Sequence, residues 1–111
     1  MMYRVIYDDQ YFRTIPACMI DARVGTPLAN ATGAMMEEFI QPKVALIVPG
    51  VLPYKLESPN GNLAGVFALQ TSSTGAVLLF SIIRPAFVED QVNISQEIVN
   101  FIQGQDWVYD K

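Results

Sequence analysis

Three breaks rich in proline, glycine and serine divide residues 44–84 into four short apolar segments. The breaks are Pro49-Gly50, Ser58–Gly61 and Ser72–Gly75. Proline presets φ and glycine adopts positive φ, so these are turn sequences. The segments between them have the length and the β-branched content of strands: Val44–Val48, Leu52–Glu57, Leu63–Thr71 and Ala76–Arg84. Because short turns join antiparallel strands, the sequence predicts an antiparallel meander over 44–84. Pro53 predicts an edge position or a bulge within the second of these strands.

Apolar residues recur at helical spacing on both sides of the meander. One predicted helix covers about 28–41, is strongest from Ala34 onward and ends at Pro42. The other covers about 89–103, with Glu89 and Asp90 in its first turn and Gly104 as its C-terminal cap. Val92, Ile98, Val99 and Ile102 are expected to form its buried stripe, which Ile94 and Phe101 broaden.

The two ends of the chain complete the expected fold. Met2–Tyr7 alternates as a strand, and 106–110 predicts a short C-terminal strand. Residues 10–25 leave two alternatives open: a short helix stopped by Pro16, or an irregular strand over Ala17–Val24. The 111 residues suit a single domain, 1–111, of the α+β class, with a mainly antiparallel sheet and two main helices.

Apolar side chains on both faces of the 63–71 segment predict a central strand covered on both sides. The side chains expected on one face of this strand are Leu63, Phe67 and Leu69, and those expected on the other face are Ala64, Val66 and Ala68. The expected core is Phe67, Leu69, Leu79, Ile83, Phe39, Ile98 and Ile102.

Composition excludes several function classes. The formal net charge is −4, and the seven basic residues are scattered, so we expect no nucleic-acid partner and no binding to anionic membrane surfaces. The chain contains no histidine, which excludes Ser-His-Asp and Cys-His catalysis and histidine-bearing zinc sites. We expect no metal and no cofactor. The start of the chain shows no signal-peptide pattern, so the expected location is the cytoplasm.

Arg84, Tyr54 and Tyr109 are the candidate ligand-binding residues. Arg84 ends an apolar strand just before a proline, and ligand groups tend to gather in such loops. Its alternative role is an ion pair with Glu89 or Asp90. The two tyrosines suit either a ligand or an interface. No catalytic residue is assigned.

We interpret four other features of the sequence as structural and not as parts of a functional site. Cys18, the single cysteine, reads as a buried structural residue. Asp8-Asp9 and Glu37-Glu38 read as solvated faces, and Met35-Met36 as core.

Residues about 44–109 resemble the middle of the GNAT N-acetyltransferase superfamily. The resemblance lies in Asn60–Phe67, then Leu78–Phe87, then the helix that follows. It implies two central strands and a helix that binds coenzyme A, with a short strand after it. In that family the helix opens with an Arg/Gln-x-x-Gly-x-Gly/Ala loop, whose backbone N–H groups bind the pyrophosphate. Here the segment Val88–Ser95 contains no glycine and carries two carboxylates.

The resemblance therefore predicts a reduced GNAT-like domain without acetyl-coenzyme A-dependent activity, ending near the family's fifth strand. Two alternatives stay open. One is a ferredoxin-like homodimer that binds a small apolar ligand, with a closed four-stranded sheet and both helices on one face. The other is a non-catalytic interaction or assembly protein. A homodimer and a small-molecule ligand are thus the partners that the sequence leaves open.

Overall fold

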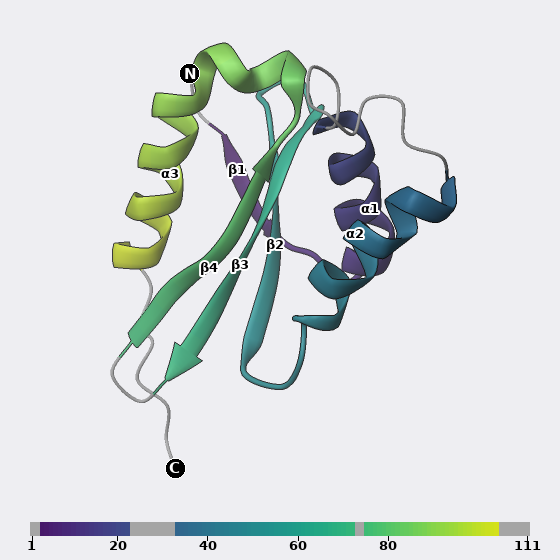
Figure 1. Ribbon diagram of the computed structural model, residues 1–111. Coiled ribbons are helices and arrows are strands. Elements are labelled where there is room, and N and C mark those ends of the chain that lie inside the picture. Colours follow the sequence, from purple (N-terminus) through teal and green to yellow (C-terminus); the bar gives the residue numbers. More distant parts are fainter. Residues whose placement is uncertain (1–2, 23–32, 73–74, 105–111) are drawn as a thin grey trace.

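The computed structural model of the chain describes residues 3–22, 33–72 and 75–104. Figure 1 shows an antiparallel sheet with α1 and α2 on one face and α3 on the other. The described elements in chain order are β1 (Arg4–Tyr7), α1 (Tyr11–Ala22), α2 (Gly33–Ala45), β2 (Val51–Glu57), β3 (Leu63–Ser72), β4 (Gly75–Ile83), the 3₁₀ helix η1 (Pro85–Asp90) and α3 (Gln91–Gly104). None of the described helices is long and apolar enough to cross a membrane.

The sheet is a four-stranded meander with the order β1-β2-β3-β4. Every neighbouring pair is antiparallel, which confirms the α+β class and the meander of its last three strands. The first expected strand is confirmed as β1. Gly50 and Gly61 have φ values of 91° and 82°, as turns before and after β2 require.

The strand expected over Val44–Val48 is wrong. α2 continues through Pro42 to Ala45, and the next two residues make turn hydrogen bonds back to Lys43 and Val44. Val44 and Ile47 are apolar because they pack against the α1 face of the sheet. Their burial there offsets the one helical hydrogen bond that Pro42 removes.

α1 was missed as a full helix, because Pro16 lies inside it. Asp8 lies three residues before the helix, and its Oδ1 atom accepts a hydrogen bond from the Gln10 backbone N–H at 3.1 Å, an Asx-turn that leads the chain into α1. Ile15 and Cys18 are its buried residues. Pro16 cannot donate the helical hydrogen bond to the Phe12 carbonyl, and Phe12 lies on the exposed side of the helix. The burial of Ile15 and Cys18 offsets the free energy that this missing bond costs.

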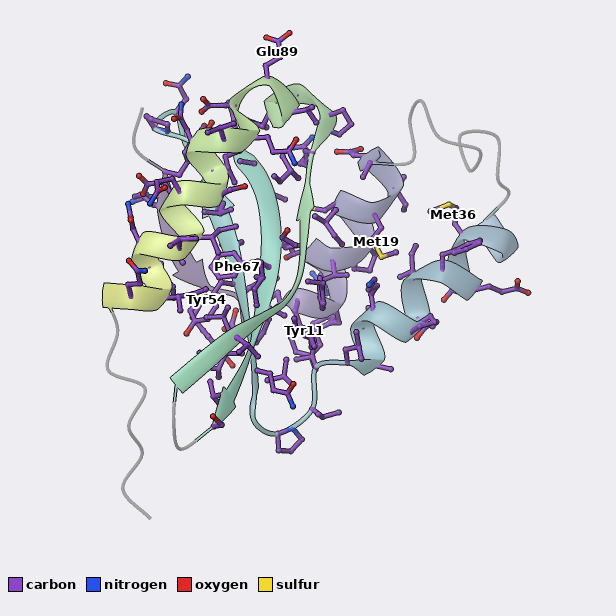
Figure 2. The ribbon with its side chains drawn as sticks, turned by 60° about the vertical axis from the view of Figure 1, so that its left-hand side comes forward. Tyr11, Met19, Met36, Tyr54, Phe67 and Glu89 are labelled. Atoms are coloured by element: carbon purple, nitrogen blue, oxygen red, sulfur yellow. The ribbon has the colours of Figure 1, made fainter. Side chains whose placement is uncertain are left out.

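Two buried clusters lie on opposite faces of the sheet. The cluster under α3 contains Tyr3, Leu56, Ala64, Phe67, Leu69, Ile94 and Ile98. The cluster under α1 contains Ile15, Cys18 and Val66, with Leu63 and Phe80 partly buried beside them. Figure 2 shows Phe67 and Tyr54 on the side of α3, and Tyr11 and Met19 on the side of α1. The expectation of a central strand covered on both faces is therefore confirmed for β3.

An extra residue in β3 changes which side chains share a face. Leu56 pairs with Gly65 but Glu57 pairs with Leu63, so Ala64 forms a bulge. The bulge reverses the alternation, and Leu63 faces α1 rather than sharing the face of Phe67. The edge position or bulge expected at Pro53 is wrong, because β2 lies between β1 and β3 and Pro53 pairs in regular register with Ala68. Its carbonyl accepts the Asp8 N–H just past the end of β1, so the side on which proline lacks an N–H faces the chain where β1 has already ended.

The expected core is right except at Phe39 and at Leu79, which belongs to neither buried cluster. Phe67, Leu69 and Ile98 are buried, Ile83 and Ile102 pack at the edge of the same cluster, and Leu79 is half-buried. Phe39 is 47% exposed. The inward side of α2 is set by Met36 and Ile40, and Phe39 lies about 100° around the helix from Ile40.

The helix expected over 89–103 is confirmed as α3, except at its start, where η1 replaces its first residues. Ile94 and Ile98 are its buried residues. Val92 is 83% exposed, and Val99 is also exposed, so these two expected core positions are wrong. Val92 lies about 200° around the helix from Ile94, on the opposite face.

The last described element is the helix α3, and the short strand expected over 106–110 lies outside the described residues. The arrangement expected of the ferredoxin-like alternative is also wrong. The two expected helices, now α2 and α3, lie on opposite faces of the sheet (Figure 1).

Candidate functional site at the junction of β4 and α3

The chain changes direction between β4 and α3, where the short helix η1 connects them. Arg84 is extended, with φ −67° and ψ 143°, and Pro85 begins η1. Proline holds its predecessor extended and has no N–H for the sheet ladder, so the strand ends here. Three hollows border this junction, with volumes of about 490, 250 and 450 Å³. Figure 2 shows Glu89 at the tip of η1, pointing away from the sheet.

Arg84 joins three elements on the α1 side of the sheet. Its Nε atom donates to Asp21 Oδ2 at 2.7 Å, and its Nη1 atom donates to the Leu63 carbonyl at 2.8 Å. Its backbone N–H also donates to the Ala64 carbonyl at 2.9 Å. The ion-pair partner expected from the sequence, Glu89 or Asp90, is therefore wrong. Asp21 was missed because residues 10–25 were not recognised as a helix.

Asp90 connects the start of α3 to Tyr3, the residue just before β1. Its Oδ2 atom accepts a hydrogen bond from the Tyr3 hydroxyl, and its Oδ1 atom accepts one from Asn93 Nδ2 at 2.6 Å. These two hydrogen bonds hold the pKa of Asp90 below its usual value, so the carboxylate stays ionised. Burial, the hydrogen bond to Asp90 and the charge of Asp90 raise the pKa of Tyr3 to about 12. Tyr3 is thus a neutral hydrogen-bond donor at neutral pH and not a general base.

Tyr54 belongs to an aromatic group on the other face of the sheet. Its ring stacks on Phe67 with centroids 5.3 Å apart and meets the edge of Phe101 at 4.8 Å. Tyr7 packs against it at 5.8 Å. Since Arg84 contacts α1 and Tyr54 contacts α3, the structure does not bring these two candidate residues into one site. Tyr109 lies outside the described residues.

Asp8 and Cys18 are the buried groups beneath α1. Asp8 was expected on a solvated face, but it is buried, and its Oδ2 atom has no hydrogen-bond partner among the described residues. An aspartate placed just before the helical spacing of Tyr11, Ile15 and Cys18 is a signal that could have indicated this turn into the helix. Burial raises the pKa of the Cys18 thiol to about 11, so it is a packed, unreactive thiol, as its sequence context indicated.

The other solvated pair, Glu37 and Glu38, is exposed as expected. Met36 is buried, which agrees with the core reading of that position. In the part of the chain that the structure describes, no group of three or more His, Cys, Asp or Glu residues is placed to hold a metal ion.

No family model, curated protein or solved structure matches this chain. The resemblance to the GNAT superfamily consequently rests on the residues quoted for it, and it enters the following argument as a proposal.

Proposed function

We propose that this chain is a GNAT-like domain that acts by binding and does not use acetyl-coenzyme A. The described architecture supports the GNAT-like part. Antiparallel strands β3 and β4 fall on the two quoted segments, and β4 leads through Pro85 into a long helix at the position where the resemblance implies the coenzyme helix.

The carboxylate of Asp90 carries the second part of the proposal. A pyrophosphate needs free N–H donors and a positive helix end where it can approach the backbone closely. At this helix start, Asp90 is an ionised carboxylate held in place by Tyr3 and Asn93. Its charge already interacts with the positive end of the helix and opposes a second anion. Val88 and Val92 add side chains where bare backbone would be required.

Arg84 does not offset this repulsion. Its guanidinium already holds Asp21 and the Leu63 carbonyl, on the face of the sheet that α1 covers. To reach a phosphate at α3 it would have to leave both partners, and the Leu63 carbonyl would lose a charged donor.

Calorimetric titration with acetyl-coenzyme A tests the proposal. We expect no binding tighter than millimolar. Micromolar binding would overturn the proposal if it were lost in Arg84→Gln and retained in Lys43→Gln. The control removes the same unit of charge from α2, where Lys43 Nζ lies 5.2 Å from the centroid of the Phe80 ring. That result would make Arg84 a phosphate contact and restore the enzyme interpretation.

An interaction or assembly protein with no small-molecule site is the second candidate. One observation favours it: Val77 and Leu78 are exposed apolar side chains on β4, the last strand in the sheet order. Monomeric proteins usually avoid such surfaces unless they bind a partner.

A further inference from the structure

The outward side of α3 carries exposed apolar side chains. Val92 is 83% exposed and Val99 is 43% exposed, whereas Ile94 and Ile98 on the inward side are buried. No described helix lies on the outward side of α3 (Figure 1). A helix that covers a sheet needs only one apolar side, so valines on the opposite side of α3 indicate that a second surface packs there.

These valines line a hollow of about 490 Å³ that runs along the helix. The residues around it come from η1 and α3 alone: Val88, Glu89, Gln91, Val92, Ser95, Gln96 and Val99. We call this surface the α3 groove. Its centre is apolar or small, and Gln91 and Gln96 add neutral polar groups beside the valines.

The spacing in the α3 groove suits a helix as its occupant. Val92, Ser95, Gln96 and Val99 are related as i, i+3, i+4 and i+7, the four positions that form a hole for a side chain of a facing helix. Ser95 is the smallest of the four, which leaves room for that side chain. The same spacing recurs one turn earlier in Val88, Gln91, Val92 and Ser95. Two holes one turn apart match apolar side chains at i and i+4 of a facing helix.

Backbone hydrogen bonding also favours a helix over a strand. The backbone groups within α3 are bonded inside the helix, so the groove has only side chains to offer. An extended segment would lie there with its N–H and C=O groups unpaired by the groove. A helix brings its own backbone hydrogen bonds and buries only its apolar side.

The charge around the groove selects a basic partner. Residues 85–104, all of which the structure describes, include three acidic residues and no lysine or arginine. Glu89 lines the groove itself. A second copy, an anionic membrane or a nucleic acid would meet like charge here, and the chain as a whole carries −4. Lysine and arginine beside the apolar side of a partner helix would meet opposite charge.

We infer that the α3 groove binds a basic amphipathic helix of another protein. Apolar side chains at i and i+4 of the partner enter the two holes, and its basic side chains lie beside Glu89. This names a partner for the domain proposed above, so it rests on the proposal that the domain acts by binding. It does not rest on the absence of acetyl-coenzyme A binding.

Fluorescence anisotropy with a labelled synthetic peptide of about 18 residues tests the inference, since shorter isolated helices are marginal. The probe carries leucine on one helical side and lysine and alanine elsewhere. Its acidic twin carries glutamate for lysine, and a scrambled peptide keeps the composition but has no apolar side. We expect the full chain to bind the probe with a dissociation constant on the order of 10–100 µM, as a small interface does. The other two peptides should bind at least about tenfold more weakly.

Variants of the chain locate the binding surface. Val92→Gln combined with Val99→Gln should weaken binding of the probe at least about tenfold, because two apolar walls of the holes are lost. The matched control, Val48→Gln combined with Val77→Gln, changes two exposed valines outside the groove and should bind like the wild type.

Glu89→Gln should weaken binding about two- to fivefold at low salt and less at high salt, as an exposed charge pair does. Glu38→Gln, at an exposed carboxylate on α2, should have no effect. Circular dichroism melts of each variant establish that it is folded.

Three results would overturn the inference. The first is that the wild-type chain binds no peptide tighter than about 1 mM. The second is equal affinity for the acidic twin or the scrambled peptide, since binding would then need neither the charge nor the helical side. The third is that the variant with both groove valines replaced binds like the wild type, which would place the peptide elsewhere. Each result leaves the acetyl-coenzyme A titration unchanged, so the two proposals fail separately.

Discussion

Replacement of Phe67 by alanine is the sharpest test of the buried core. Phe67 is 1% exposed on the α3 face of β3. Its ring stacks on Tyr54 at 5.3 Å and meets Phe101 at 6.1 Å, so the substitution removes two aromatic contacts and leaves a cavity between them. Phe→Ala substitutions in cores cost about 3–5 kcal/mol, and the cost here should lie in the upper half of that range because aromatic pairs contribute beyond buried area.

Phe39→Ala is the matched control. Phe39 is 47% exposed on α2, although its helical spacing alone predicts a core position. Its removal should cost less than about 1 kcal/mol, because little area is buried and alanine favours the helix. Urea unfolding of the two variants, followed by circular dichroism, gives both free energies with a common m-value. Equal losses for the two, or a loss below about 1 kcal/mol for Phe67→Ala, would refute the assignment of the two faces.

Two further predictions follow from local contacts. Gly65→Ala would place a Cβ 2.4 Å from the Ile82 carbonyl oxygen, so β3 and β4 must separate, and the variant should lose about 2 kcal/mol in a thermal melt; Gly104→Ala, which meets nothing within 4 Å, should lose nothing. Burial raises the pKa of Cys18 from 9.0 to about 11, so its stabilising contribution is complete below pH 9 and is lost as the pH rises through 11. Cys18→Ala should therefore show a shallower fall in unfolding free energy between pH 9 and pH 11, with Tyr3 accounting for a remaining fall up to about pH 12; an unchanged slope would contradict the burial of the thiol.

The turns made β2, β3 and β4 predictable from sequence. Pro49-Gly50 and Ser58–Gly61 require particular φ angles, so they fix strand ends regardless of tertiary context. Pro85 likewise ended β4 where it was expected to. Predictions from helix propensity were wrong where tertiary packing outweighed the propensity of single residues. Pro16 and Pro42 both lie inside helices, because apolar faces on α1 and α2 supply more free energy than the lost hydrogen bonds cost.

The side chains around the candidate site were harder to predict than the strands. Arg84 was singled out as a candidate ligand-binding residue, but its side-chain partner is Asp21, which is 63 residues away in sequence. Tyr3 and Asp90 are 87 residues apart, and no local pattern links them. The bulge at Ala64 also moved Leu63 to the other face, since one inserted residue reverses the alternation of a strand.

Backbone amide shifts during a titration with acetyl-coenzyme A test the central claim most directly, because they report on the start of α3 itself. The account predicts that amide resonances of residues 84–95 stay in place up to about millimolar ligand, because the Asp90 carboxylate already occupies the positive end of the helix. Saturable micromolar shifts concentrated in residues 84–95 would contradict it, since they would show that a pyrophosphate reaches this helix start despite that carboxylate.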